Sequence, residues 1–403
     1  MTSTRTKKSL AAAIAVCLFT TAFAAKKAAP VLIPGTFIRG ADVTCLYDLE
    51  KSGAKFFDTD GTEKEMLAIL KDHGANWIRL RVWVAPESDY GMSAIEKAAE
   101  TGKKAKALGF RILLDLQYSD AWTNVDSQKK PASWDPYIME RLTTEIGKYS
   151  RNCMETMKKA DALPDMVQLG SEINKGILLT TSKDEHATIN GKLGTDACVQ
   201  LLNTAASSIR DFDSMIQIML HFGKGGDKTE IAECLDKIDN VNYDWIGLSY
   251  YPFYTDNGTA ENLGNTIKYI SSKGKKVMIA ETSFPWTCEI PEEQADAVKN
   301  SVWYNGDDGS MMQVYDNLMN VPNLAFGSYS GKKIIKPSKY NQKNYLEELK
   351  KIIYINGGKG FFYFGGDWMT LDRKDPAKGS PWENQALFDL DHKALSAVEA
   401  FSN

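Results

Sequence analysis

The sequence predicts a single-domain α/β protein with a (β/α)8 barrel fold. Short apolar runs typical of buried strands alternate with longer segments of helical periodicity over most of the chain. Strands that are separated by helices favour parallel pairing, and eight such units close a barrel. A doubly wound open sheet is disfavoured, because neither a G-x-G-x-x-G nor a G-K-[ST] loop follows the first run.

Eight apolar runs carry the strand pattern. They are Phe37–Asp42, Trp77–Val82, Arg111–Leu116, Met166–Gly170, Ile216–Leu220, Trp245–Ser249, Val277–Glu281 and Gly360–Phe364. Between the first two runs, Lys64–Asp72 has the spacing of an amphipathic helix that ends before Gly74. Ala94–Leu108 repeats this pattern before Gly109, which indicates a second helix between the second and third strands.

Two connections are longer than a single helix requires, residues 172–215 and 282–359. They follow the fourth and seventh strands and predict additional loops at the carboxyl end of the barrel, where barrel enzymes hold their catalytic groups. No internal repeat, low-complexity linker or flexible hinge marks a second domain. We therefore expect residues 25–403 to form one domain.

The charge balance excludes one broad class of protein. The 403 residues include 48 Lys and Arg against 52 Asp and Glu, which gives a formal net charge of −4. A nucleic-acid-binding protein typically has a basic balance and a face on which Lys and Arg cluster. We therefore expect no nucleic-acid partner for this mildly acidic chain.

The first residues have the pattern of an export signal. Three basic residues come first, Arg5, Lys7 and Lys8. An apolar stretch follows at residues 9–21, and Ala22-Phe23-Ala24 has the form of a cleavage site. The apolar stretch is shorter than the ~20 residues that span a bilayer. We expect a signal peptide over residues 1–24 and a mature chain that is secreted or periplasmic, has no membrane contact after cleavage and is monomeric.

Five cysteines remain in the mature chain: Cys45, Cys153, Cys198, Cys234 and Cys288. No two of them have C-x-x-C spacing, so a zinc or redox site is not indicated. An exported protein can form disulfides, but an odd number of cysteines leaves at least one thiol free. Buried free thiols and a single disulfide both remain open, and we expect no metal and no cofactor.

Two glutamates provide the strongest chemical signal. Glu172 lies at the end of the fourth predicted strand and Glu281 at the end of the seventh. A carboxylate that ends an apolar strand is costly to bury unless it is used or paired. Because their strands lie three apart around the barrel, the two glutamates would face each other across its mouth. Retaining glycoside hydrolysis requires two facing carboxyl groups ~5–5.5 Å apart. The alternative is that each glutamate forms a rim ion pair with an arginine.

Other polar residues near strand ends are candidates for substrate binding. Arg79 and Arg81 share one face of the second strand, because side chains alternate along a strand. An arginine beside a carboxylate lowers the pKa of that carboxylate, and a structural ion pair is the alternative role. His221 ends the fifth strand, where a satisfied rim histidine is the alternative. Tyr250 and Tyr251 end the sixth strand, and we expect one to hydrogen-bond a catalytic glutamate and the other to pack.

Four tryptophans lie a few residues beyond predicted strands and are candidate platforms for sugar rings: Trp83, Trp122, Trp286 and Trp368. An aromatic ring combines a large apolar surface with a polar edge, which suits a sugar-binding surface, but the same ring is equally suited to a protein core. The sequence alone leaves both roles open for each of the four.

Eight short segments lie in order along the chain, each near a strand end or the C-terminus. They are Gly40-Ala41-Asp42-Val43, Ile78-Arg79-Leu80-Arg81-Val82-Trp83-Val84, Ser119-Asp120-Ala121-Trp122, Gly170-Ser171-Glu172-Ile173, Ile218-Met219-Leu220-His221, Ser249-Tyr250-Tyr251-Pro252-Phe253-Tyr254, Ala280-Glu281-Thr282 and Glu383-Asn384-Gln385-Ala386-Leu387-Phe388-Asp389. Through these segments the chain resembles glycoside hydrolase family 53, the endo-β-1,4-galactanases. The resemblance implies a (β/α)8 barrel with Glu172 as acid/base, Glu281 as nucleophile and Arg79 beside the nucleophile. The implied substrate is the β-1,4-galactan of type I arabinogalactan and pectin side chains.

Three positions depart from the pattern of the resembled family. Ser171 stands where the family usually has Asn, and Gln117 stands where it usually has His. Phe364-Gly365-Gly366 takes the place of a Trp-Glu-Pro run at the end of the eighth strand. We expect Ser171 and Gln117 to line the sugar site, together with Asp120 and Trp122. Because a serine hydroxyl cannot reach as far as an asparagine amide, the departures allow lower activity, a changed substrate or a binding protein.

The first hypothesis is therefore an exported, retaining endo-β-1,4-galactanase that acts on a polysaccharide without a cofactor. A retaining hydrolase of another β-linked glycan is the alternative among enzymes. A weakened glycan-binding barrel is the alternative from a different class, and the presence of both glutamates argues against it. Some members of the resembled family bind calcium through an Asp-Gly-Asp-Gly-His run. This run is absent here, and we interpret the acidic stretch at residues 305–310 as a solvated loop.

Overall fold

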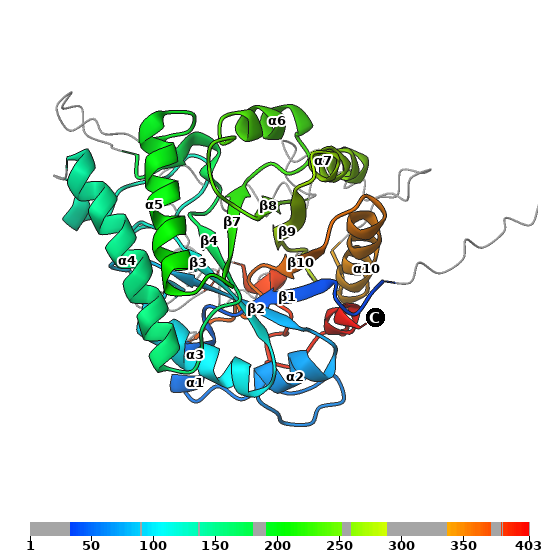
Figure 1. Ribbon diagram of the computed structural model, residues 1–403. Helices are drawn as coiled ribbons and strands as arrows, with labels where there is room; N and C mark the ends of the chain where they lie inside the picture. The colour runs from blue at the N-terminus through cyan, green and yellow to red at the C-terminus, as the bar shows by residue number, and fades with distance from the viewer. Residues whose placement is uncertain are drawn as a thin grey trace, which may run out of the picture. The chain divides into compact units, whose positions relative to one another are not determined.

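Eight parallel strands close into a barrel in the order β1-β10-β9-β8-β7-β4-β3-β2 (Figure 1). They are β1 (Ile38–Asp42), β2 (Trp77–Val82), β3 (Arg111–Leu116), β4 (Met166–Leu169), β7 (Gln217–Phe222), β8 (Trp245–Ser249), β9 (Lys276–Thr282) and β10 (Gly360–Tyr363). Each of them lies on one of the eight predicted apolar runs. The predicted (β/α)8 barrel is therefore confirmed, and pairing of β1 with β10 joins the first strand to the last.

The computed structural model describes residues 33–88, 91–135, 138–179, 191–251, 259–287, 337–371, 380 and 382–402. All of them belong to one compact unit, Ile33–Asn403. The predicted signal peptide, Cys288 and the acidic stretch at residues 305–310 lie outside the described residues. No helix in the described part of the chain has the length and apolar character that crossing a bilayer requires.

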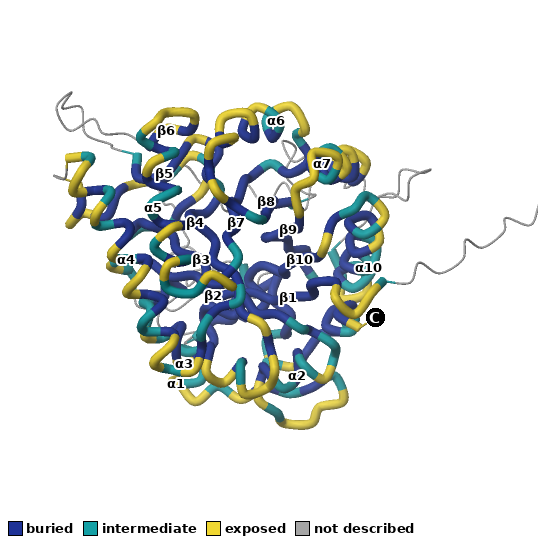
Figure 2. Tube along the Cα trace, viewed as in Figure 1, coloured by how far each residue is buried: buried dark blue, intermediate teal, exposed yellow. Residues whose placement is uncertain are grey.

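Helices surround the strands (Figure 1). They are α1 (Leu46–Lys51), α2 (Met66–Asp72), α3 (Ile95–Ala107), α4 (Met139–Lys159), α5 (Asp196–Phe212), α6 (Lys228–Asp236), α7 (Ala260–Ser272) and α10 (Lys339–Ile355), with short 3₁₀ turns at Ala132–Trp134, Ile173–Lys175, Glu383–Gln385 and Ser396–Phe401. The predicted helices at Lys64–Asp72 and Ala94–Leu108 correspond to α2 and α3. Long helices such as α4 and α5 turn an apolar face toward the strands, and Figure 2 shows the alternation of buried and exposed residues along them.

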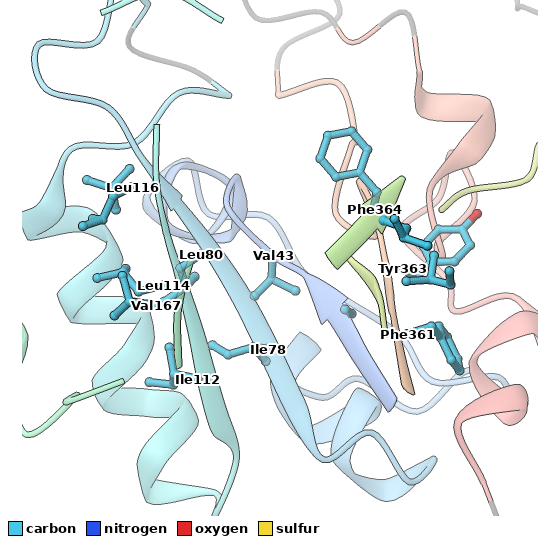
Figure 3. Close-up of a cluster of buried hydrophobic side chains, with 14 of the residues drawn as sticks. Val43, Ile78, Leu80, Ile112, Leu114, Leu116, Val167, Phe361, Tyr363 and Phe364 are labelled. Carbon is cyan, nitrogen blue, oxygen red and sulfur yellow. The ribbon is translucent and has the colours of Figure 1, made fainter. Parts of the chain in front are cut away.

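Side-chain alternation along the strands separates two apolar cores. Leu114, Leu116 and Val167 belong to the outer core, which lies between the strands and the helices (Figure 3). The smaller inner core fills the barrel and consists of Ile38, Trp77, Leu113, Met166, Met219, Trp245, Met278, Ala280 and Phe362. A Cβ at Gly40 would meet the ring of Phe362 at 2.2 Å, so a glycine is the residue that fits on the inner face of β1.

The two long connections lie at the carboxyl ends of β4 and β9, as predicted. The connection after β4 contains two short strands, β5 (Gly176–Ile177) and β6 (Gly191–Lys192), which pair antiparallel before α5 begins. The connection after β9 contains α10, and its residues 288–336 lie outside the described part of the chain. Both connections therefore begin at the end of the barrel where the polar residues described below are found.

Candidate active site

Polar side chains replace apolar ones inside the barrel near the carboxyl ends of its strands. The group comprises Asp42, Arg79, Arg81, Asp115, Gln117, Gln168, His221, Ser249 and Glu281, all of which are buried. On β2, Trp77 belongs to the inner core, and Arg79 and Arg81 follow at alternate positions. On β3, the same alternation leads from Leu113 to Asp115. The polar group therefore rests on the inner core and forms the next layers above it.

The fully buried guanidinium of Arg79 lies at the centre of this group. Its Nη1 atom donates to Asp42 Oδ2 at 3.2 Å, and its Nη2 atom donates to Asp115 Oδ2 at 2.6 Å. Nη2 also lies 2.7 Å from Glu281 Oε1 and 3.3 Å from Gln168 Oε1. Three carboxyls therefore share one arginine away from water, where a buried charge that loses its partner is strongly destabilising.

The carboxyl of Glu281 is held in its ionised form. Burial is the largest influence and would raise its pKa, but the charges of Arg79 and Arg81 and the hydrogen bond from Arg79 act together to hold the pKa below its usual range. The hydroxyl of Tyr251 donates to Oε2 at 3.0 Å, and the hydroxyl of Ser249 lies 3.4 Å from the same oxygen. Tyr251 is therefore the tyrosine that contacts Glu281, whereas the ring of Tyr250 is buried in the outer core.

Glu172 follows β4 in the left-handed backbone conformation, with φ 52° and ψ 51°. Residues other than glycine rarely adopt this conformation. The 3₁₀ turn that follows is held by hydrogen bonds of the side chain of Asn174. Asn174 accepts a hydrogen bond from the N–H of Gly223 at 2.7 Å and donates to its carbonyl at 3.2 Å. A Cβ at Gly223 would lie 3.1 Å from the carboxyl carbon of Glu172, so glycine leaves space for that side chain.

The pKa of Glu172 is shifted in the opposite direction from that of Glu281. Burial and the negative charge of Glu281 raise the pKa of Glu172 to about 7. Hydrogen bonds from the Ser249 side chain and from the Val125 backbone N–H, which lies 3.2 Å from Oε2, offset this rise only in part. Below about pH 7, Glu172 therefore retains a proton while Glu281 is ionised. Two carboxyls whose pKa values are pushed apart are suited to one acid and one nucleophile.

His221 is a fully buried, neutral imidazole, because burial lowers its pKa to about 3. The backbone N–H of Glu172 donates to Nδ1 at 3.3 Å, so Nδ1 carries no proton. The proton is on Nε2, which donates to the hydroxyl of Ser249 at 2.9 Å. Ser249 in turn interacts with both glutamates. These contacts orient the neutral imidazole and the Ser249 hydroxyl beside the two carboxyls.

Two of the residues that depart from the resembled family contact this network directly. Ser171 Oγ lies 3.4 Å from Glu281 Oε1 and 3.3 Å from His221 Nδ1. Gln117 donates from Nε2 to Asp115 Oδ2 at 2.5 Å, and its carbonyl oxygen accepts from a threonine hydroxyl in the loop after β3. Both side chains are therefore turned toward charged partners within the protein.

Arg81 is enclosed by aromatic rings. Its guanidinium carbon lies 4.6 Å from the ring centroid of Trp122, 4.8 Å from that of Phe364 and 5.3 Å from that of Trp83. Its Nε atom donates to Asp42 Oδ2 at 2.9 Å. Arg81 thus makes the contacts of a structural ion pair stacked against aromatic rings. Trp83 is 1% exposed and packs in the core, so it offers no surface to a sugar.

The remaining candidate sugar platforms differ in exposure. Trp122 and Trp286 are partly exposed, as the sugar-stacking role requires. Trp368 is buried, and its ring centroid lies 4.7 Å from that of Phe364. Trp382, which the sequence analysis did not single out, is partly exposed and lies 6.0 Å from Trp368. Among these tryptophans, Trp122, Trp286 and Trp382 therefore remain candidate platforms for sugar rings.

Asp120 ties loops together rather than extending the polar group. Its Oδ1 atom accepts the backbone N–H of Ala85 at 2.9 Å, and its Oδ2 atom accepts that of Ala132 at 2.8 Å. These bonds join the segment after β2 to two parts of the segment after β3. The contacts of Asp120 are those of a residue that positions the loop carrying Trp122.

Four residues of the network were not singled out from the sequence: Asp42, Asp115, Gln168 and Ser249. The sequence contained a signal for the two aspartates, because two arginines on the inner face of one strand require buried acidic partners. Neighbouring strands supply them in register, with Asp42 beside Arg79 and Asp115 beside Arg81. For Gln168 and Ser249 the sequence contains no comparable signal.

Within the described ranges, no group of three or more His, Cys, Asp or Glu side chains is placed to hold a metal ion. The four described cysteines are free and buried: Cys45, Cys153, Cys198 and Cys234. Burial raises the pKa of the thiols of Cys153, Cys198 and Cys234 to about 12. These three thiols are therefore protonated and unreactive at neutral pH.

Comparison with known proteins finds similarity over most of the chain. The family model described as Glycosyl hydrolase family 53 matches residues 38–401. An endo-beta-1,4-galactanase of Bacillus subtilis (strain 168) is 30% identical over 385 residues, which cover 91% of this chain and 85% of that protein. An arabinogalactan endo-beta-1,4-galactanase of Cellvibrio japonicus is 28% identical and covers 91% of this chain and 89% of that protein. The solved family 53 catalytic domain of Ignisphaera aggregans has a TM-score of 0.76 and 29% identity, over 92% of this chain and 96% of that domain.

Proposed function

The chain belongs to glycosyl hydrolase family 53 and is a glycoside hydrolase, and from this premise we propose that it cleaves β-1,4-galactan internally, with retention. The observation that supports this proposal best is the pair of glutamates with opposite pKa shifts. Glu281 is ionised beside Arg79, and Glu172 keeps a proton up to about pH 7. One carboxylate and one carboxylic acid are what a double displacement needs.

In the first step, the Glu281 carboxylate attacks the anomeric carbon while Glu172 donates its proton to the leaving glycosidic oxygen. The glycosidic bond breaks and a glycosyl ester of Glu281 forms. In the second step, ionised Glu172 accepts a proton from water, which attacks the anomeric carbon and frees Glu281. Ester formation removes the negative charge that helps to raise the pKa of Glu172, and this loss suits Glu172 to act as a base.

The relatives support the choice of β-1,4-galactan, as found in type I arabinogalactan and pectin side chains, because those named above are described as galactanases. A retaining hydrolase of another β-linked glycan is the second candidate. Ser171, Gln117 and Phe364 contact the network around Arg79. Each of the three differs from the residue type that is usual at its position in the family. A barrel that only binds glycans is disfavoured, since binding does not require two carboxyls in opposite protonation states.

Export is part of this proposal. The basic, apolar and A-x-A pattern over residues 1–24 supports a secreted or periplasmic protein, and a polysaccharide substrate suits that location. Sequencing the N-terminus of protein recovered from the periplasm and from the medium should find Ala25 first. Light scattering of the same material should give the mass of one chain.

The function is tested by release of reducing sugar from a panel of polysaccharides. Galactan should be the preferred substrate over β-linked xylan, mannan and glucan. Glu172→Ala and Glu281→Ala should each lower turnover by orders of magnitude with an unchanged fold. Glu155→Ala, at a partly exposed position on α4, should act as wild type. Preference for another glycan selects the second candidate, and absence of hydrolysis on every polymer contradicts the enzymatic proposal.

A further inference from the structure

The side chain of Gln117 is held at both ends. It lies just beyond β3 and is 4% exposed. Its Nε2 group donates to Asp115 Oδ2 at 2.5 Å. Its Oε1 atom accepts a hydrogen bond from the hydroxyl of Thr123, which is buried as well. Each end of the amide therefore has a partner within the protein, and these two partners fix its orientation.

The hydroxyl of Thr123 decides which way the amide of Gln117 faces. While the hydroxyl donates to the carbonyl oxygen, the NH2 group is directed at Asp115. In the reversed orientation the carbonyl oxygen would face the Asp115 carboxyl, which would bring two acceptors together in a buried place. Without the hydroxyl, the carbonyl oxygen loses its donor and the observed orientation loses part of its support.

The orientation of this amide matters because Asp115 and Glu281 share one nitrogen of Arg79. Nη2 lies 2.6 Å from Asp115 Oδ2 and 2.7 Å from Glu281 Oε1. Burial raises the pKa of Asp115 to about 7, so the loss of one donor changes its ionised fraction near neutral pH. The charged groups that face Asp115 are Arg79 and Arg81 on β2, Asp42 on β1 and Glu281 on β9.

The loop that follows β3 also reaches the second glutamate. Val125 donates its backbone N–H to Glu172 Oε2 at 3.2 Å, and this bond favours the ionised carboxyl. The charged groups that face Glu172 are Glu281 on β9 and Arg79 on β2. His221 on β7 contacts its backbone and is uncharged. A bond that anchors this loop therefore acts on the surroundings of both carboxyls.

We propose that Thr123 is a positioning residue of the active site. Its hydroxyl locks the Gln117 amide onto Asp115 and anchors the loop that presents the Val125 N–H to Glu172. One hydroxyl thereby influences both carboxyls: Glu281 through Asp115 and Arg79, and Glu172 through the Val125 N–H. This inference rests on the proposed hydrolase function and adds a residue that touches neither the substrate nor the reacting atoms.

The test is a set of three threonine variants measured on galactan. Thr123→Val keeps the shape of the side chain and removes the hydroxyl, and Thr123→Ser restores the hydroxyl without the methyl group. Thr266→Val is the matched control, because Thr266 is a buried residue of α7 whose hydroxyl bonds only within that helix, to the carbonyl of Asn262 at 3.1 Å. Thr123→Ala replaces the valine variant if the latter does not fold.

Thr123→Val should lower kcat about tenfold, equivalent to about 1.4 kcal/mol of transition-state stabilisation, with little change in KM. The alkaline limb of its pH profile should move to higher pH, since Glu172 loses a bond that favours its ionised form. Thr123→Ser and Thr266→Val should match the wild type in both respects. Wild-type kcat and pH profile in Thr123→Val would overturn the proposal, and so would equal losses in Thr123→Val and Thr123→Ser.

A measurement without substrate separates this inference from the hydrolase proposal. The free energy of unfolding depends on pH wherever the pKa of Glu172 differs between the folded and unfolded chain. In Thr123→Val this dependence should extend to higher pH than in Thr123→Ser. If it does so in a protein that cleaves no glycan, the positioning role stands and the proposed function fails. If the two curves coincide, the positioning role fails whatever the activity.

Discussion

Replacing Glu172 with Gln should make the folded protein more stable than the wild type at pH 8 but not at pH 4. In the folded chain the pKa of Glu172 is about 7, against an ordinary value of 4.5. Between these two values the folded chain holds a proton that the unfolded chain has lost. The free energy of unfolding of the wild type therefore falls as the pH rises through this window. Glutamine has no proton to lose, so the variant escapes this fall.

The size of the effect follows from the same two pKa values. Each pKa unit corresponds to about 1.4 kcal/mol of preference between the protonation states, so a rise from 4.5 to about 7 sets a ceiling of about 3 kcal/mol. Glu172 is partly exposed, and solvent screening lowers the expected difference to about 1–2 kcal/mol. The gain should be complete above about pH 8 and absent below pH 4.

The matching change at the other glutamate should have the opposite sign. The pKa of Glu281 lies below its usual range, because the charges of Arg79 and Arg81 and the hydrogen bond from Arg79 together exceed the effect of burial. Its ionised form therefore contributes stability above the unfolded pKa, and this contribution is lost as the pH falls through the folded pKa. Glu281→Gln removes it and leaves Arg79 with one charged partner fewer, so the variant should be less stable than the wild type at pH 8.

The assay is urea unfolding followed by tryptophan fluorescence at pH 4, 6 and 8 for the wild type, Glu172→Gln and Glu281→Gln. Glu155→Gln, at a partly exposed position on α4, controls for the loss of a carboxylate as such. Curves for Glu172→Gln and the wild type that run parallel over this range would refute the reasoning. So would a destabilisation of the same sign in both active-site variants.

Three further predictions concern catalysis. Proton NMR should show the β-anomer as the first product, because a double displacement retains the configuration at the anomeric carbon, and an initial α-anomer contradicts it. Tyr251→Phe removes the hydroxyl that donates to Glu281 Oε2 at 3.0 Å and should therefore raise the pKa of Glu281. The acid limb of the kcat/KM profile should move to higher pH, and an unchanged acid limb would count against this contact. Ser171→Asn should raise kcat/KM on galactan about tenfold, since the longer amide can reach a sugar hydroxyl that the serine cannot, in a contact made mainly in the transition state. A loss on galactan would indicate a site repacked for another sugar.

The strands could be predicted from the sequence because each is buried on both faces. A run such as Trp245–Ser249 is buried throughout and apolar up to its last residue, and this pattern is typical of a strand in a parallel barrel. The helix at Ala94–Leu108 was predicted to within one residue at each end, since α3 spans Ile95–Ala107. In contrast, α1 (Leu46–Lys51) was missed, because six residues are too few to display the helical period.

The two glutamates could be predicted because each ends an apolar strand. The residues that contact the glutamates could not be predicted in full. Strand alternation shows on which face of the sheet a side chain lies, but not which other side chain it meets. Asp115 meets Arg79 only through the register of the closed barrel. The choice between Tyr250 and Tyr251 depends on the backbone just beyond β8, where alternation no longer applies. The orientation of Gln117 depends on a hydroxyl in the following loop.

Arg79 and Glu281 are 202 residues apart in the chain. The half of the barrel formed by β1 to β4 carries Arg79 and its two aspartate partners, and the half formed by β7 to β10 carries Glu281. The ion pair between Arg79 and Glu281 therefore joins the two halves of the barrel. If the proposed mechanism holds, a nascent chain acquires activity only after the carboxyl-terminal strands have closed the ring, long after its first strands have emerged.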